Sequence, residues 1–282
     1  MTIGVSTYSF YWQWHETAPE PLTLLQMIEK TASWDVRLLQ ICDYPLVEGF
    51  DDDQLQAVGD AAGRRGVDLE LGTRGVQPAH LETHLRLAQR LGATLVRSMV
   101  RAEEAATAVD LLRQVIPAYE QAGVRLALET YEQVPTARLL EIVRTVDSPS
   151  LGICLDPANC VAALETPRTT IDLVADVVLN LHVKDFAFTR QGGWVGFTLA
   201  GAPLGEGLLD LGYLMDRVRP DARGINQIIE HWLLWQGDSA TTCATEDEWT
   251  LHNLDVLRRL ETATSPDPGP HPRAHPDKEP PP

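Results

Sequence analysis

The chain has 282 residues, of which 44% are hydrophobic and 22% charged, and its formal net charge is −17 at pH 7. This length suits one large domain or two small ones, and α/β barrels often reach it as a single unit. The acidic balance, without a cluster of Lys and Arg, disfavours nucleic acid as a partner, and no apolar run approaches the roughly 18 residues needed to span a bilayer.

Short apolar segments alternate with longer amphipathic segments along the chain, as expected when each strand is followed by a crossover helix. The first residues, MTIGVSTYSF, indicate a strand from the third residue onward. We predict eight strands, at Ile3–Ser9, Leu38–Asp43, Asp68–Thr73, Leu95–Val100, Arg125–Thr130, Gly152–Asp156, Asn180–Asp185 and Asn226–His231. Helical segments between them include PLTLLQMIEKTASW, DDDQLQAVGDAAGRRG, PAHLETHLRLAQRLG and AATAVDLLRQVIPAYEQAG, and several end at a glycine suited to a C-cap.

Eight β-then-α units favour an α/β fold made of a single (β/α)₈ TIM barrel over an open doubly wound sheet, which usually has fewer strands. No GxGxxG or GxxxxGK[ST] motif follows the first strand. We assign the barrel to residues 1–263. The remaining segment, 264–282, is rich in proline and almost free of apolar residues, so we predict a disordered tail.

The cysteines and the N-terminus both bear on localisation. Cys42, Cys154, Cys160 and Cys243 form neither a CxxC pair nor a plausible disulfide framework, so we expect reduced, mostly packed thiols. The first residues lack the basic and apolar regions of a secretory signal. We therefore expect a cytoplasmic protein.

Residues of the metal-ligand type stand at the ends of the last four strands. They are Glu129, Asp156, His182 and Glu230. TIM barrels place their chemistry at this end, and strand alternation allows all four side chains to point inward. Three carboxylates and an imidazole would repel one another without a cation. The pattern therefore predicts one divalent ion, Mn²⁺, Mg²⁺, Co²⁺ or Zn²⁺, whose identity stays open.

The segment NLHVKDF shows the alternation most clearly. His182 and Lys184 share one side of this strand, and Leu181 and Val183 share the other. We expect the two apolar residues to pack against the helices, with His182 at the metal and Lys184 nearer the mouth of the barrel. Taken singly, a Glu at a strand end usually caps a helix or faces solvent, a lone His is usually a hydrogen-bonded core residue, and a Lys often lies on the surface. Their occurrence together at successive strand ends favours a functional site.

These residues, in the segments ALET, LDPAN, HVKD and IIEHW, resemble the xylose-isomerase-like TIM-barrel superfamily, the sugar phosphate isomerase/epimerase group. The resemblance covers about residues 1–262 and implies a single divalent metal held by Glu129, Asp156, His182 and Glu230. In the ketose epimerases of this group the two glutamates also act as acid and base. One departure is Asn159, which stands where those epimerases often carry His; Asn can bind a sugar hydroxyl but cannot carry a proton at neutral pH.

The first functional hypothesis is therefore a metal-dependent isomerase or epimerase of a sugar or sugar derivative that acts through an enediolate. Glu129 and Glu230 are the candidates for moving the proton, with Lys184 donating to a substrate oxygen. The run HVKDF…GF…GAPLGEG resembles a branch of the superfamily that includes decarboxylases of 3-oxo sugar acids, which is the alternative. An endonuclease acting on abasic DNA and a barrel that only binds sugar are weaker alternatives.

Further residues are candidates for binding a carbohydrate substrate. Arg74, Arg97 and Arg190 lie near or after the ends of strands three, four and seven and suit an anionic group, although salt bridges to Glu70 or Asp43 explain them equally well. After strand one, Tyr8, Tyr11, Trp12 and Trp14 can stack on a sugar or simply pack. The glycine-rich segment GGWVGFTLAGAPLGEGLLD is long enough for a lid. Barrels that resemble this one often self-associate, so a homo-oligomer is also expected.

Overall fold

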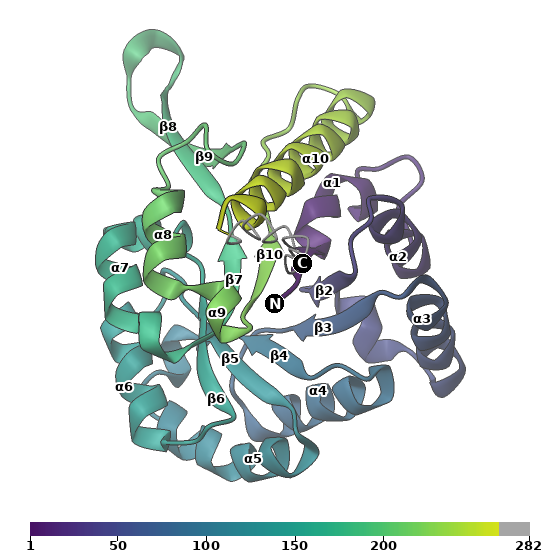
Figure 1. Ribbon diagram of the computed structural model, residues 1–282, viewed down its shortest axis with the longest axis vertical. Coiled ribbons are helices and arrows are strands. Elements are labelled where there is room, and N and C mark those ends of the chain that lie inside the picture. The colour runs from purple at the N-terminus through teal and green to yellow at the C-terminus, as the bar shows by residue number, and fades with distance from the viewer. Residues whose placement is uncertain (265–282) are drawn as a thin grey trace, which may run out of the picture.

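A computed structural model of the chain describes residues 1–264, and Figure 1 shows their arrangement. The last helix continues through Thr264. The rest of the predicted tail, 265–282, lies outside the described residues. Within residues 1–264 no helix combines the length and apolar character needed to cross a membrane.

Eight parallel strands close into a barrel, which confirms the predicted (β/α)₈ fold. Around the barrel each strand pairs with its neighbour in the sequence, and the last pairs with the first. The barrel strands are β1 Ile3–Ser6, β2 Leu38–Cys42, β3 Asp68–Gly72, β4 Leu95–Ser98, β5 Arg125–Glu129, β6 Leu151–Leu155, β7 Val178–Val183 and β10 Asn226–Ile229. Several end one or more residues before the predicted limit; β1 stops at Ser6 because residues 7–10 form a 3₁₀ helix.

Helices surround the barrel (Figure 1). They are α1 Tyr11–Trp14, α2 Leu24–Ser33, α3 Asp52–Arg65, α4 Pro78–Leu91, α5 Ala108–Ala122, α6 Thr136–Val146, α7 Pro167–Val174, α8 Leu211–Val218, α9 Pro220–Arg223 and α10 Ser239–Thr264. Thr23 and Asp51 begin α2 and α3 with capping boxes. The predicted glycine caps are confirmed, since Gly66, Gly92 and Gly123 end α3, α4 and α5 in the left-handed conformation.

An antiparallel hairpin interrupts the β–α alternation after β7. It consists of β8 Asp185–Arg190 and β9 Phe197–Ala202, and it projects beyond the barrel in Figure 1. The segment predicted as a long glycine-rich loop therefore contains a strand. Gly201 anchors β9 because its N–H donates to the Trp232 carbonyl at 3.0 Å, and a Cβ there would lie 2.7 Å from the Trp232 backbone nitrogen.

The core lies between the barrel and its helices. Leu181 and Val183 on β7 are fully buried in it, as the alternation predicts, together with Leu126 and Leu128 on β5. A separate small apolar cluster is formed by Leu95, Ala127 and Cys154 on β4, β5 and β6, with Leu179 packed against it. All four cysteines are free, and three are buried.

Candidate active site at the carboxyl end of the barrel

The structure brings the four predicted metal ligands together. Glu129 is the last residue of β5 and His182 the penultimate residue of β7, while Asp156 and Glu230 follow β6 and β10 directly. One ligand atom from each lies within 4.8 Å of the other three, and all four side chains are buried. They converge because every strand of a parallel barrel ends at the same rim.

The four potential ligand residues have the chemistry of a cation site. Each of the four residues has one buried polar atom that forms no hydrogen bond in the structure, namely Glu129 Oε2, Asp156 Oδ2, His182 Nδ1 and Glu230 Oε1. Two of these oxygens are in ion pairs, Glu129 Oε2 with Arg97 and Asp156 Oδ2 with Lys184. Buried polar atoms normally form hydrogen bonds, so this cluster of four needs an explanation. Three oxygens and one imidazole nitrogen are ligands that divalent ions accept.

His182 is oriented from below by a side chain that the sequence analysis did not identify. Its Nε2 lies 2.8 Å from Gln40 Oε1, and the Gln40 amide nitrogen donates to Glu70 at 2.9 Å and to Asn180 at 3.0 Å. Since the amide nitrogen is committed to those two acceptors, Gln40 presents its oxygen, and the His182 proton resides on Nε2. Nδ1 faces the carboxylates, 3.3 Å from Glu129 Oε1. Burial opposes a charge on the ring, but these acids raise the pKa of His182. On losing its proton, Nδ1 would offer its lone pair to an ion.

Lys184 lies beside two of these ligands. Its Nζ is 2.7 Å from Asp156 Oδ2, 3.3 Å from Glu230 Oε2 and 4.4 Å from the centre of the Trp232 ring. Burial opposes the ammonium charge, but the carboxylates of Asp156, Glu230 and Glu129 raise the pKa of Lys184 above its ordinary value. Lys184 is therefore a buried ammonium group at neutral pH.

The neighbouring positive charges also change the pKa values of Asp156 and Glu230. Burial alone would raise the pKa of Asp156, but Lys184 and His182 lower it below its ordinary value. Glu230 behaves in the same way, with burial opposed by His182, Lys184 and Arg97, and its pKa is lowered. Both carboxylates are ionised at neutral pH.

Two of the predicted arginines reach the site, and both pair with acids. Arg97 is buried inside the barrel, with its Nε 2.6 Å from Glu129 Oε2 and its Nη2 3.5 Å from Asp43 Oδ2. Arg74 is half exposed and donates to both oxygens of Asp43 at 2.9 Å. The Tyr8 hydroxyl completes this group at 3.2 Å from Asp43 and 2.9 Å from Arg74. The salt-bridge alternative involving Asp43 therefore accounts for much of the geometry of Arg74.

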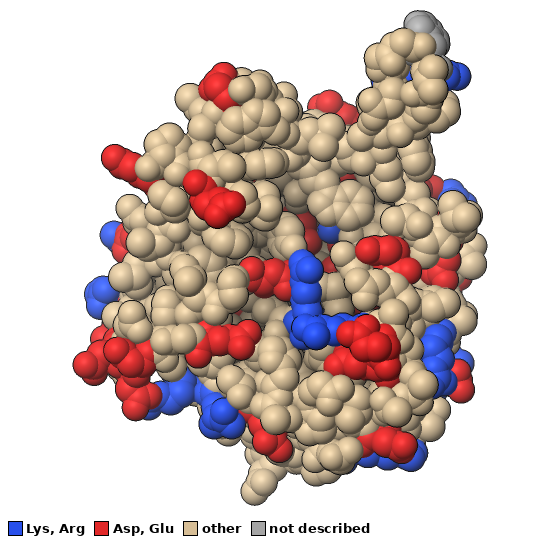
Figure 2. Space-filling model, turned by 180° about the vertical axis from the view of Figure 1, so that it is seen from behind, with Lys and Arg blue, Asp and Glu red and all other residues tan. Residues whose placement is uncertain are grey.

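A cavity of about 350 Å³ opens above these residues. Its lining includes the predicted Tyr8, Arg74, Arg97, Glu129, Asn159, Lys184 and Glu230. Asn159 donates to Glu129 Oε1 at 2.9 Å, while its own buried Oδ1 has no partner. In Figure 2 acidic and basic side chains meet around a hollow near the middle of the molecule, below the projecting hairpin.

Two predicted substrate-binding residues are placed elsewhere. Trp12 packs edge-on against Trp235, and its indole N–H donates to the Leu233 carbonyl at 2.8 Å. Arg190 lies at the far end of β8, 4.7 Å above the Phe197 ring. Neither lines the cavity.

The cavity also contains residues that the sequence analysis did not select as substrate contacts. Asp43, Tyr131 and Trp232 follow β2, β5 and β10 and line its wall, and Leu199 reaches it from the hairpin. The signal that could have identified the first three was their position, one to three residues beyond a strand end. Asp43 also has left-handed backbone (φ 48°), which is uncommon outside glycine and often marks a functional position.

Similar proteins share this architecture. The sequence model of the family described as "Xylose isomerase-like TIM barrel" matches residues 28–260. A protein of Pectobacterium atrosepticum named 3-oxo-isoapionate decarboxylase is 49% identical over 261 residues, which cover 91% of this chain and 95% of the relative.

Solved structures agree at the level of the fold. D-psicose 3-epimerase from Clostridium cellulolyticum, solved with D-tagatose, superposes with a TM-score of 0.71 at 15% identity over 92% of this chain and 99% of that one. A xylose isomerase-like TIM barrel protein from Mycobacterium smegmatis, in complex with magnesium, gives a TM-score of 0.65 at 14% identity. The match covers 90% of this chain and 97% of that one. The chain therefore belongs to the xylose isomerase-like TIM-barrel family.

Proposed function

We propose that Glu129, Asp156, His182 and Glu230 bind one divalent metal ion and that the protein is a decarboxylase of a 3-oxo sugar acid. The convergence of four buried ligand atoms within 4.8 Å of one another supports the metal. When bound, the ion would supply Lewis-acid stabilisation of negative charge on a substrate oxygen. The proposed activity replaces isomerisation or epimerisation as the first hypothesis.

The observation that carries the choice of reaction is the state of Glu129. Arg97 Nε lies 2.6 Å from one of its oxygens, and the Asn159 amide donates to the other at 2.9 Å. Both oxygens of Glu129 therefore already face donors, and neither is free to take a proton from a substrate carbon. Isomerisation or epimerisation needs a base to remove a proton, whereas decarboxylation of a 3-oxo acid needs none.

After CO₂ has left, an acid must supply a proton to the carbon that carried the carboxylate. The bond between C2 and the carboxylate carbon breaks, its electron pair moves into the C2–C3 bond, and the 3-oxo oxygen takes the negative charge. C2 then takes up a proton. Lys184 is placed to supply it, since its buried ammonium lines the cavity, and solvent returns the proton to Lys184 after product release.

The cavity suits a carboxylate substrate. Arg74, Arg97 and Lys184 line the cavity and offer cationic groups to a substrate carboxylate. The unpartnered Asn159 Oδ1 can accept from a sugar hydroxyl, and the Trp232 ring offers a face for the carbon skeleton. The relative from Pectobacterium atrosepticum, named a decarboxylase of a 3-oxo acid, further supports this substrate class.

A specific observation favours one second candidate, a ketose epimerase. Glu230 Oε1 is buried at the cavity without a hydrogen-bond partner, so it remains available as a base. In that reaction Glu230 would remove the proton that Lys184 or solvent later replaces.

One NMR experiment in D₂O distinguishes the two candidates. The metal-loaded protein is incubated with a panel of 3-oxo sugar acids, ketoses and sugar phosphates. The decarboxylase proposal predicts release of CO₂ from a 3-oxo acid and one deuterium at the carbon that lost it. Deuterium incorporation into a ketose at constant carbon number, with every oxo acid untouched, would instead establish the epimerase.

A further inference from the structure

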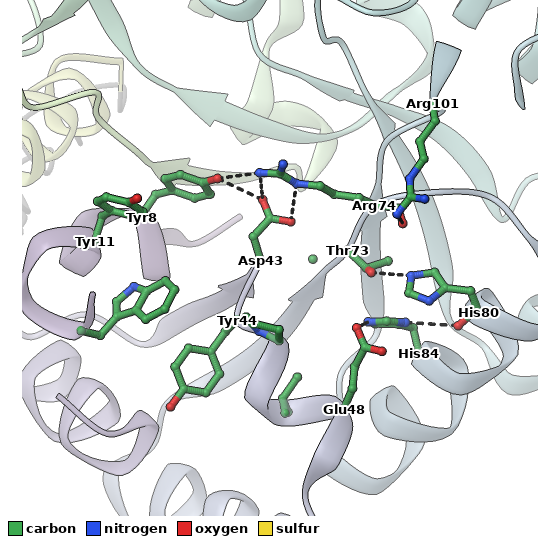
Figure 3. A pocket seen from close by; sticks show the side chains of 14 residues that line it. Tyr8, Tyr11, Asp43, Tyr44, Glu48, Thr73, Arg74, His80, His84 and Arg101 are labelled. Atoms are coloured by element: carbon green, nitrogen blue, oxygen red, sulfur yellow. Dashed lines mark hydrogen bonds and ion pairs between the residues drawn. The ribbon is translucent and has the colours of Figure 1, made fainter. Parts of the chain in front are cut away.

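A second cavity, of about 430 Å³, lies next to the active site and contains a cluster of potential metal ligands of its own. Figure 3 shows its lining. Tyr8, Asp43 and Arg74 separate the two cavities and line both of them. Beyond them, Glu48 comes from a 3₁₀ helix, Pro45–Gly49, that follows β2, while two histidines come from α4.

The histidines are His80 and His84, one helical turn apart in the segment HLETH. Side chains at i and i+4 share a helix face, and their rings lie 4.5 Å apart between centroids. Glu48 Oε1 is 3.7 Å from His84 Nε2. One ligand atom from each of the three residues lies within 4.8 Å of the other two.

The far nitrogen of each ring is already hydrogen-bonded. His84 Nδ1 lies 3.2 Å from the His80 carbonyl oxygen, which can only accept, so Nδ1 carries the proton. His80 Nε2 lies 2.7 Å from the Thr73 hydroxyl, which leaves Nδ1 as its ligand atom. Such bonds fix the tautomer and orientation of metal-binding histidines in proteins.

This arrangement leaves two acceptors facing each other. Because its proton lies on Nδ1, the neutral His84 ring presents a lone pair on Nε2. That lone pair is directed at the Glu48 carboxylate, and no proton lies between them. A cation coordinated by both groups removes the conflict.

We propose that Glu48, His80 and His84 form a second metal site that takes a divalent transition-metal ion such as Zn²⁺. Two imidazoles and one carboxylate are the ligands of open zinc sites, in which a fourth position is left for water or another ligand. The nitrogen-rich set should prefer Zn²⁺, Co²⁺ or Ni²⁺ over Mg²⁺, whereas the oxygen-rich barrel site accepts Mg²⁺ or Mn²⁺.

The site would tie two neighbouring βα loops together. Glu48 belongs to the connection after β2 and the histidines to the helix after β3, and between them the Asp43–Arg74 pair forms part of the active-site wall. An ion at this position would stabilise that wall without taking part in the reaction.

The test counts zinc per chain. The full-length protein is stripped with a chelator, loaded with Zn²⁺, dialysed and analysed by mass spectrometry for metal content, beside the variants Glu48→Gln and His80→Asn. These variants change partly exposed residues, whereas replacing the buried His84 could unfold α4. His15→Asn is the matched control, since His15 lies on the aromatic segment after β1 and contacts none of the cluster.

Each of the two variants should bind one zinc ion fewer than the wild-type protein, with unchanged circular dichroism, and His15→Asn should bind as many as the wild type. Zn²⁺ should also raise the melting temperature of the wild type further than that of either variant. Equal zinc content in the wild type and both variants would overturn the proposal.

Discussion

Lys184 shows how a single residue links the site to the reaction. Its ammonium group lies 2.7 Å from Asp156 and 3.3 Å from Glu230, and it lines the cavity. We predict that Lys184→Gln lowers kcat by a factor on the order of 10² to 10⁴, the range for loss of a general acid. Metal affinity should not fall, because the variant removes a positive charge from beside the ligands.

Steady-state kinetics and metal titration of this variant are compared with Lys30→Gln, which removes a lysine paired with Asp247 on the outside of the barrel. The control should keep wild-type turnover. If Lys184→Gln kept more than about half of the wild-type kcat, Lys184 could not be the proton donor.

Gln40 supports the metal indirectly. Because the Gln40 oxygen accepts a hydrogen bond from His182 Nε2, Gln40→Leu should allow the ring to rotate or change tautomer. Loss of such a contact typically weakens metal binding about 10- to 100-fold. A competition titration with a fluorescent chelator measures this, with Gln227→Leu as a buried glutamine control on the outward side of β10. Unchanged affinity in Gln40→Leu would show that Gln40 does not orient His182.

For single residues, the sequence predicted the proposed metal ligands better than the side chains that contact them. The four ligands could be identified because the two-residue period of strands fixes the direction of Glu129 and His182 once the strands are known. The contacts of Arg97 with Glu129 could not be identified, since a strand-internal arginine carries no sign of its partner. Asp43 and Trp232 lie beyond the strand ends, where periodicity no longer specifies direction.

Among the elements, the hairpin and the loop after it depend on Asp185. This buried carboxylate accepts four backbone N–H groups, from Phe186, Gly205, Gly207 and Leu209. The loop passes so close that a Cβ on Gly207 would lie 2.2 Å from Asp185 Oδ1, which explains the glycine in the GAPLGEG segment.

We predict that Asp185→Ala lowers the free energy of unfolding by about 2 to 4 kcal/mol, because several N–H groups lose their acceptor together. Urea denaturation measures the loss. Asp210→Ala is the matched control, since Asp210 caps the exposed start of α8 and its removal should cost only about 1 kcal/mol. A loss of under 1 kcal/mol in Asp185→Ala would contradict this role.

The strands and helices were predictable where the strand–helix unit repeats along the chain. Each strand–helix unit has its own apolar period, and capping residues fix the helix ends. The hairpin was missed because its glycines indicate a loop, while β8 and β9 stabilise each other through a pairing that local sequence does not encode.

For the whole molecule, α10 and the N-terminal segment meet at a buried acid, Glu246. It accepts from the Trp12 backbone N–H and the Gln13 side chain, each at 3.0 Å. Burial raises the pKa of Glu246 from 4.5 to about 8. The folded protein thus binds a proton that the unfolded chain releases between these values, so this contribution to stability is lost as pH rises from 4.5 to about 8.

We predict that Glu246→Gln flattens the fall in unfolding free energy across this range by up to about 1.4 kcal/mol per pH unit. Urea denaturation of the wild type and variant at several pH values between 5 and 9 tests this. Parallel curves for the two proteins would contradict the prediction.

The closed barrel could be predicted as a whole because eight repeated units leave few other topologies. The reaction could not, because the same four ligands suit either candidate reaction. The two candidates differ in the roles of Glu129, Glu230 and Lys184, whose contacts exist only in the folded chain.

The most direct test of the account follows the carboxylate of a 3-oxo sugar acid labelled with ¹³C at C1. The metal-loaded protein should release the label as CO₂, a chelator should abolish the release, and a divalent ion should restore it. Label retained in the substrate while its C–H protons exchange with solvent, or release that chelation does not affect, would contradict the metal-dependent decarboxylase.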